Sequence, residues 1–179
     1  MFFQKPIRCL KKKQSKNNSK NSDIDLALLT DGLRAEREQG ITIDVAYKYF
    51  ATEKRKFIIA DAPGHEQYTR NMVTGVSNSD LIIILIDARN GVITQTKRYA
   101  IIGSLMGLKK AIVAINKMDI EKYSEVVYTK IKTDFEALLP QLHYGEVHYV
   151  LISALAGDNI VSNLNNTPWY KGASILELL

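Results

Sequence analysis

The segment Asn116-Lys117-Met118-Asp119 has side chains that can read a purine base, and it directly follows an apolar run at residues 111–115. The Asp119 carboxylate can accept hydrogen bonds from both the ring N–H and the exocyclic amine of guanine, whereas adenine does not present these two donors together. A site built on such bonds can reject the wrong base by roughly 10⁴-fold or more, because its polar group would otherwise be buried unpaired. The Lys117 stem can lie along the base, and Asn116 can link neighbouring loops. The alternative is a polar helix N-terminus that Asp119 caps.

A second polar segment, Asp61-Ala62-Pro63-Gly64-His65, follows another short apolar run. A carboxylate such as Asp61 at a strand end can organise Mg²⁺ beside the terminal phosphates of a nucleotide, usually through a water molecule. Gly64 allows a backbone N–H to approach a γ-phosphate, and a Pro-Gly turn can change shape when that phosphate leaves. His65 would then lie where it can orient an attacking water. The alternative is an ordinary turn with an N-capping aspartate.

Two weaker signals complete the set. Ser153-Ala154-Leu155 follows apolar residues 149–152, and its small side chains allow a backbone N–H to reach a base carbonyl. Thr42 comes two residues after a glycine, and it could supply a hydroxyl to Mg²⁺ and an N–H to the γ-phosphate. Such a segment is ordered by a triphosphate and released by a diphosphate. The alternative for Thr42 is a polar loop that ends in a strand-starting threonine.

The elements that position these segments are short apolar runs rich in β-branched residues, at residues 57–60, 81–86, 111–115 and 149–152. Continuous runs of this length predict strands buried on both faces, as in parallel sheets. Residues 45–50 alternate in the manner of an edge strand. Apolar residues at helical spacing lie between the runs, at Tyr99, Ile102, Leu105 and Met106 and again at Val127, Ile131, Phe135, Leu138 and Leu142.

This alternation of strands and helices predicts an α/β fold, with an open, mostly parallel sheet and helices on both faces. Ligands in such sheets bind beyond the carboxyl ends of the strands. The polar segments fall at those ends.

Composition and charge narrow the class of protein. The chain has 179 residues and 46% hydrophobic content, which fits one soluble domain. Seven of its 24 basic residues lie in residues 1–20, which hold no acid, so the remaining residues carry 17 basic against 19 acidic side chains. The positive charge therefore belongs to a short arm, which we expect to be solvated and disordered and not to bind nucleic acid. One cysteine excludes a disulfide framework, no apolar run suggests a membrane span or a secretory signal, and we expect a cytoplasmic protein.

Together these motifs resemble a known superfamily. Residues 36–44 (EREQGITID), 61–65, 116–119 and 153–155 are similar to the second to fifth guanine-nucleotide motifs of the translation-factor GTPases. Within that superfamily, residues 25–33 (DLALLTDGL) and 64–72 (GHEQYTRNM) resemble most the large, GTPase subunit of bacterial sulfate adenylyltransferase. The resemblance runs from Ser22 to Leu179. It therefore divides the chain into a basic arm at residues 1–21 and a partial GTP-binding domain at residues 22–179.

The resemblance implies a P-loop-NTPase-like fold, with GTP and Mg²⁺ as cofactors. It assigns Asp61 to the metal-linked acid, Gly64 to the γ-phosphate sensor and His65 to the water-orienting residue. It assigns the reading of guanine to Asn116, Lys117 and Asp119, with Ala62 in place of the usual threonine. The implied partner is the small catalytic subunit of the same enzyme, on which GTP hydrolysis drives adenylyl transfer from ATP to sulfate.

One element of the superfamily does not occur in the sequence. No Gly-x-x-x-x-Gly-Lys-[Ser/Thr] phosphate loop is found among the 179 residues, and the first strand and helix of the fold are missing with it. That strand lies in the middle of the sheet in this fold, so its loss should expose core. We therefore expect a truncated domain that is marginally stable and has little or no hydrolytic activity alone. Two alternatives to a working GTPase domain follow, namely a degenerate GTPase-like binding module and an elongation factor fragment.

Overall fold

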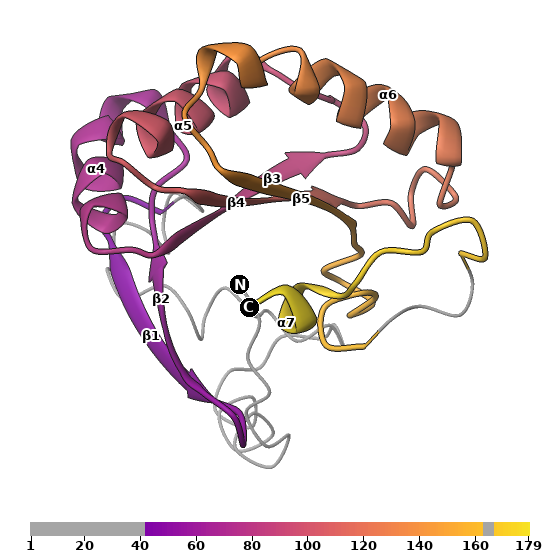
Figure 1. Cartoon of the computed structure of the whole chain (residues 1–179), viewed down its shortest axis with the longest axis horizontal. Helices are drawn as coiled ribbons and strands as arrows, with labels where there is room; N and C mark the ends of the chain where they lie inside the picture. Colours follow the sequence, from indigo (N-terminus) through magenta and orange to yellow (C-terminus); the bar gives the residue numbers. More distant parts are fainter. Residues whose placement is uncertain (1–41, 163–166) are drawn as a thin grey trace, which may run out of the picture. The chain divides into compact units, whose positions relative to one another are not determined.

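The computed structural model describes residues 42–162 and 167–179 (Figure 1). The predicted basic arm and the segment at residues 36–41 lie outside the described residues. The chain divides into two compact units, residues 1–75 and residues 76–179, and each is described by itself below.

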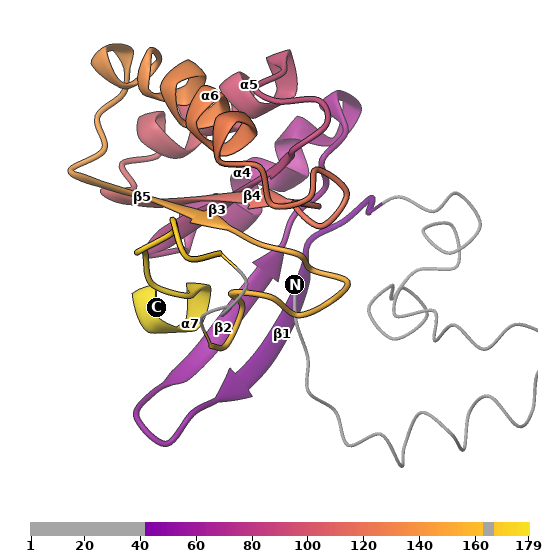
Figure 2. The same cartoon turned by 90° about the vertical axis from the view of Figure 1, so that its right-hand side faces the viewer.

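The first unit contains an antiparallel hairpin of β1 (Ala46–Ala51) and β2 (Lys56–Asp61), shown in Figure 2. The Thr52 hydroxyl fixes its turn by accepting from the Arg55 amide at 3.1 Å. Phe50 and Phe57 stack across the pair with ring centroids 4.6 Å apart. Exposure alternates along β1, which confirms the edge-strand pattern predicted for residues 45–50.

The hairpin corrects one prediction about burial. Residues 57–60 were expected to form a strand covered on both faces, yet the Ile58 side chain is 66% exposed. Within the described residues β2 pairs only with β1, so it lacks the second neighbour that a central strand has. The short helix η1 (Glu66–Tyr68) and helix α4 (Thr69–Ser77) follow, and α4 crosses the boundary between the units.

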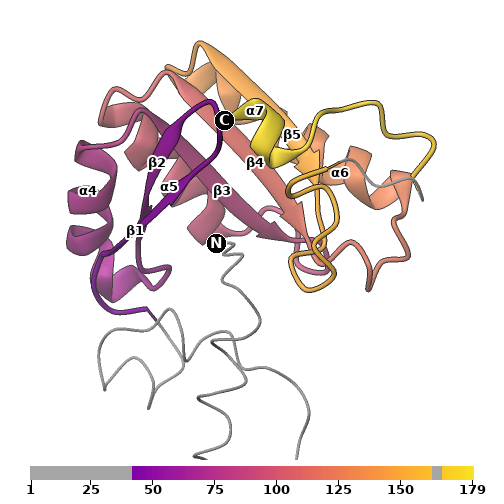
Figure 3. The ribbon, with the colours of Figure 1, turned by 90° about the horizontal axis from the view of Figure 1, so that it is seen from below.

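The second unit is built on a parallel sheet of β3 (Leu81–Asp87), β4 (Lys110–Asn116) and β5 (Glu146–Leu151), in the order β3-β4-β5. Figure 3 shows the three strands side by side. The register places Asp87 opposite Asn116 at the carboxyl ends of the first two strands. The predicted α/β class with a parallel sheet is confirmed.

Two helices cover one face of this sheet and a short one lies on the other (Figures 1 and 2). They are α5 (Thr94–Leu105) and α6 (Glu125–Glu136) on the first face and α7 (Ile175–Leu178) on the second. A short helix, η2 (Leu139–Gln141), follows α6. Ile131 and Phe135 of α6 are buried in the core, as the helical spacing predicted, and Phe135 packs against Tyr149 of β5.

Among the strands in the described part of the chain, β4 alone is buried on both faces along most of its length. In β3 the side chains of Ile84 and Ile86 are covered, whereas Ile83 is 39% exposed and Leu85 is 52% exposed. Among the described strands β3 has a neighbour on one side alone, and the second face of the sheet is less covered there. The apolar run of residues 81–86 therefore has the composition that is typical of a central strand, although β3 lies at the edge of the described sheet.

The buried face of α5 also differs from its prediction. Leu105 and Met106 are exposed by 74% and 40%, and the residues that face the core include Ala100, Gly103 and Ser104. A Cβ at Gly103 would lie 3.1 Å from the Ile82 side chain, so the helix approaches β3 closely through small residues. The small side chains at this contact determine which face of α5 is buried, and the spacing of apolar residues in the sequence does not indicate side-chain size.

The segment that follows β5 packs back onto α6 through aromatic contacts. Trp169 and Tyr170 pack against Tyr128 of α6, with ring centroids 5.4 and 5.8 Å from it. Ser174 and Glu177 then form a capping box at the start of α7. None of the helices within residues 42–162 and 167–179 combines the length and the apolar character needed to cross a membrane.

Candidate nucleotide-binding site

The loops that follow β4 and β5 are joined by one asparagine side chain. Asn116 Oδ1 accepts hydrogen bonds from the Lys117 amide at 2.7 Å and from the Ala154 amide at 2.9 Å. Met118 adds a second connection, because its amide donates to the Ile152 carbonyl at 3.2 Å and its side chain is fully buried. The structure therefore contains the link between loops that the sequence predicts for Asn116.

Asp119 does not cap a helix. It lies in a series of turns that separates β4 from α6, and the helix is capped instead by Ser124, whose hydroxyl accepts from the Val127 amide at 3.4 Å. The Asp119 side chain is half-buried, and no hydrogen bond to its carboxylate is found within the described part of the chain. The capping alternative is thus wrong, and a carboxylate acceptor stands beside the Asn116 link.

The turns after β4 are held by Tyr123. Its amide donates to the Met118 carbonyl at 2.7 Å, and its hydroxyl makes a short hydrogen bond to the Asp158 carboxylate. Burial and that hydrogen bond raise the pKa of Tyr123 to about 12, so the phenol stays protonated and donates. Lys117, Lys122 and Tyr123 all have positive φ. Such backbone is held only where several contacts fix it, as they do here.

The loop after β5 is organised by the buried Ser153. Its hydroxyl accepts from the Ala156 amide at 3.3 Å and its carbonyl from the Gly157 amide at 2.8 Å. The Ala154 amide is occupied by Asn116. Leu155 is 90% exposed, and a hydrogen bond from its amide is absent among residues 42–162 and 167–179. Leu155 therefore offers the unoccupied N–H of this segment.

Sequence reasoning missed a charged cluster at the end of β3. The Lys117 ammonium lies 2.8 Å from Asp87 Oδ2, and Arg89 donates to both oxygens of Asp87 through Nε at 2.9 Å and Nη2 at 2.6 Å. The hydrogen bonds from Arg89 and Lys117 hold the pKa of Asp87 well below its ordinary value of 3.8, against the opposing effect of its burial. The available signal was positional, since Asp87 directly follows the apolar run of residues 81–86.

The second predicted segment, in the first unit, forms a turn after β2. Asp61 is the last residue of β2, Pro63 is buried, and Gly64 and His65 are exposed. His65 is the N-cap of η1, where its Nδ1 lies 3.4 Å from the Gln67 amide. The residue that caps this helix is therefore the histidine and not the aspartate that the turn alternative named.

Thr42 is half-buried and lies ahead of β1. The Asn71 side chain of α4 donates to the neighbouring Ile43 carbonyl at 2.8 Å, which anchors this stretch to the helix. A cluster of three or more His, Cys, Asp or Glu side chains able to hold a metal does not occur in the described ranges.

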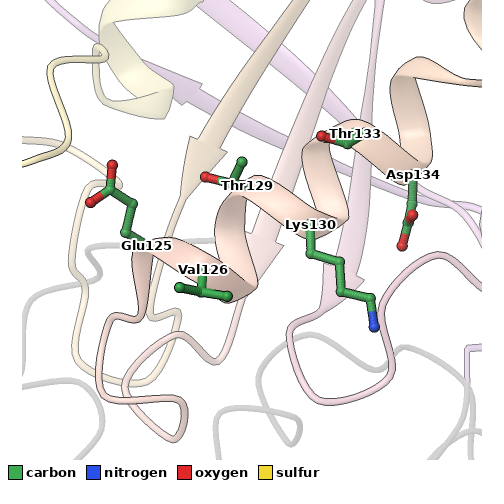
Figure 4. A pocket seen from close by; sticks show the side chains of 6 residues that line it. All are labelled: Glu125, Val126, Thr129, Lys130, Thr133 and Asp134. Atoms are coloured by element: carbon green, nitrogen blue, oxygen red, sulfur yellow. The ribbon is translucent and has the colours of Figure 1, made fainter.

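A shallow surface depression elsewhere in the second unit involves none of these residues (Figure 4). All of its lining side chains are exposed, and they lie on successive turns of α6. They are Glu125, Val126, Thr129, Lys130, Thr133 and Asp134. A depression on one helix face encloses no ligand, so the loops after the strands remain the candidate site.

Comparison with known families decides the class. The family described as "Elongation factor Tu GTP binding domain" matches residues 7–178. The chain belongs to this family. The match includes most of the basic N-terminal segment, and it associates the loops after β4 and β5 with a GTP-binding domain.

The relatives in this family with high identity carry one name. The chain is 56% identical to sulfate adenylyltransferase subunit 1 of Chromobacterium violaceum and 56% identical to that of Psychromonas ingrahamii, over all 179 residues. It spans 38% of the length of each. The predicted resemblance of residues 22–179 to the large subunit of sulfate adenylyltransferase is therefore confirmed, and the match extends to residues 1–21 as well.

Solved structures agree with the fold of this family. The match to a bacterial selenocysteine-specific elongation factor covers 74% of this chain and 23% of the factor's chain, with 26% identity and a TM-score of 0.63. The Saccharomyces cerevisiae Ski7 GTPase-like domain, bound to GDP and inorganic phosphate, matches 96% of the chain and 41% of its own, with a TM-score of 0.74. At 19% identity the second likeness shows the fold alone.

Proposed function

We propose that the loops after β4 and β5 bind the base of a guanine nucleotide, as part of the GTP-binding domain of a sulfate adenylyltransferase large subunit. The observation that carries this proposal is the double hydrogen bond of Asn116, which fixes the Asp119 loop and the Ser153–Leu155 loop relative to each other. Two loops from neighbouring strands, held together in this way, can contact one planar ligand from two sides.

Each group in the loops has a role in this proposal. The Asp119 carboxylate accepts from the ring N–H and the exocyclic amine of guanine, and the Leu155 amide donates to the base carbonyl. The Lys117 stem covers one face of the ring. Adenine lacks the ring N–H and has an amine where guanine has the carbonyl, so it would leave the Asp119 carboxylate and the Leu155 amide without partners. Such unpaired groups account for rejection of the wrong base.

For the first unit, taken by itself, we propose a role in phosphate and metal binding. Asp61 and the Thr42 hydroxyl would hold Mg²⁺ together with water and phosphate oxygens, and the bound metal would neutralise phosphate charge. Gly64 is exposed and has no Cβ, so its backbone can approach a γ-phosphate. His65 is exposed next to it and would orient the attacking water.

From the names of the relatives we also propose the pathway step that this domain serves. In the proposed reaction ATP and sulfate give adenylyl sulfate and diphosphate on a separate small subunit, and hydrolysis of GTP to GDP and phosphate drives that transfer. The 56% identity to sulfate adenylyltransferase subunit 1 favours this role over an elongation factor, since the elongation factor structures match at 26 to 28%.

The sequence also supports a second function, that of a binding module without hydrolysis. The 179 residues contain no phosphate-loop motif, whose backbone and lysine cradle the β- and γ-phosphates. We therefore expect the 179-residue polypeptide to select guanine over adenine while binding weakly, and to show no measurable GTP turnover.

Two experiments test the proposal. In the first, a fluorescent GTP analogue is titrated with the folded chain and Mg²⁺, and GDP and ADP compete. Displacement by GDP and not by ADP supports guanine recognition, and equal displacement contradicts it. In the second, residues 1–179 replace the matching segment of the Chromobacterium violaceum subunit. GTP-dependent formation of adenylyl sulfate with the small subunit supports the enzyme role, and a folded but inactive chimera favours the module without hydrolysis.

A further inference from the structure

Asp87 lies outside every segment that the sequence assigns to nucleotide binding, yet it contacts the base-reading segment directly. It ends β3, and its register partner is Asn116 at the end of β4. The Ala88 amide donates to the Asn116 carbonyl at 2.9 Å, which closes this end of the ladder. The parallel pairing thereby brings the Asp87 carboxylate to Lys117, the residue that follows the neighbouring strand.

Lys117 is held at both ends of its length. Its amide donates to Asn116 Oδ1 at 2.7 Å, its φ is +64°, and its ammonium lies 2.8 Å from Asp87 Oδ2. The aliphatic stem stretches between these two anchors, and the side chain remains 44% exposed. A lysine with a free end has many rotamers, and their loss on binding opposes affinity. Here much of that freedom is removed before any ligand arrives.

Arg89 fixes the orientation of Asp87 in turn. Its Nε and Nη2 bind the two carboxylate oxygens as a fork, at 2.9 and 2.6 Å, and its amide donates to Oδ1 at 3.0 Å. A bidentate contact of this kind sets the plane of the carboxylate. The oxygen that faces Lys117 is therefore directed and not free to rotate.

We propose that Asp87 is a positioning residue for guanine recognition, which holds the Lys117 stem extended for the base before the nucleotide binds, with Arg89 fixing the Asp87 carboxylate. The inference rests on the proposed function of the Asn116 loops. The Lys117 charge is already paired with Asp87. Lys117 therefore contributes to binding through contact of its stem with the base, and not through a charge contact with the phosphates.

A purely local role for Asp87 predicts different results. The Asp87 carbonyl accepts from the amides of Asn90 and Gly91, both at 3.0 Å, and its side chain accepts from Arg89, so it also stabilises the turn after β3. If that were its whole role, Asp87→Asn would lower stability and leave the mobility of Lys117 unchanged. The mobility of Lys117 in Asp87→Asn therefore distinguishes the positioning role of Asp87 from a purely local role.

The first measurement needs no ligand. The full chain is labelled with [ε-¹³C]lysine, the Lys117 signal is assigned by its loss in Lys117→Arg, and its order parameter is compared between wild type and Asp87→Asn. The matched control is Glu146→Gln, which removes a carboxylate paired with Lys110 at 3.3 Å at the opposite end of the sheet. We expect Lys117 to become mobile in Asp87→Asn alone. An unchanged Lys117 order parameter in a folded variant overturns the proposal.

The second measurement links the pair to the base. Guanosine and GDP are titrated into wild type and Asp87→Asn, with amide shifts as the readout. We expect both ligands to bind roughly 3- to 10-fold more weakly to the variant, and by the same factor, which corresponds to restoring the freedom of one long side chain. Equal affinity in both proteins overturns the positioning role. If wild type binds neither ligand, the proposed function fails and the base-positioning role with it, while the Lys117 order parameter still decides whether the pair forms.

Discussion

The Asn116 side-chain oxygen accepts a hydrogen bond from the Ala154 amide at 2.9 Å, and the two residues are 38 positions apart in the sequence. The same oxygen accepts the Lys117 amide, so a single atom holds both loops at the carboxyl ends of β4 and β5. Asp119, Lys117 and the exposed Leu155 belong to the two loops that this oxygen joins, and we propose that these loops bind guanine.

Replacing Asn116 with alanine should loosen both loops at once. The change leaves the Lys117 and Ala154 amides without their acceptor, which costs roughly 1–3 kcal/mol in the free energy of unfolding. It should also remove discrimination between GDP and ADP. Urea unfolding and nucleotide competition measure the two effects. Asn78→Ala, at an exposed asparagine, is the control. Unchanged discrimination in Asn116→Ala would show that the loops are positioned by other contacts.

We expect Asp119→Asn to change the base preference of the chain. An asparagine can accept from the ring N–H and donate to a carbonyl, and xanthine presents that pair of groups where guanine presents the ring N–H and an amine. The variant should therefore lose affinity for GDP and gain affinity for xanthosine diphosphate. Competition binding with the two diphosphates measures the exchange. Retained GDP affinity without any gain for xanthine would place Asp119 outside the base site.

The candidate site illustrates what the sequence could and could not predict. The segments after β2, β4 and β5 were located because each follows a run of β-branched residues. The parallel pairing of β4 with β5 brings the carboxyl ends of those two strands together. The contact of Asp87 with Lys117 could not be predicted, because it depends on the register that pairs Asp87 with Asn116. The base-reading, metal and water-orienting roles of the site residues remain predictions.

The two faces of β3 should differ in their effect on stability. Ile84 is 2% exposed and lies in the core, so Ile84→Ala should cost about 2–5 kcal/mol in the free energy of unfolding. Leu85 is 52% exposed, and Leu85→Ala should cost below about 1 kcal/mol. Urea titrations of both variants give the comparison. A similar loss in both would mean that the outer face of β3 is covered in solution.

That contrast also shows why burial was only partly predictable. The run at residues 81–86 has no alternation, so sequence alone indicated a strand covered on both sides. The cover alternates because helices pack on one face of the sheet, which buries Ile84 and Ile86, while Ile83 and Leu85 on the other face are exposed. The face of α5 was missed for a different reason, since Gly103 and Ser104 are buried by close approach and not by hydrophobicity.

Stability should depend on pH through Asp87. Its pKa in the folded chain lies below the ordinary 3.8, so the unfolded chain takes up the proton first as the pH falls. The carboxylate therefore contributes stability above pH 3.8, and this contribution is lost as the pH falls below that value. The difference in unfolding free energy between wild type and Asp87→Asn should be constant near neutral pH and shrink from about pH 4 downward. A difference independent of pH across that range contradicts the Arg89 and Lys117 contacts.

The most direct test of guanine recognition is to map amide shifts in ¹⁵N-labelled chain as GDP or ADP is added with Mg²⁺. We predict that GDP shifts the amides of Lys117, Asp119 and Leu155 and that ADP at the same concentration leaves them in place. Equal responses to the two nucleotides, or GDP shifts confined to other parts of a folded chain, would contradict the assignment of these loops to the guanine base.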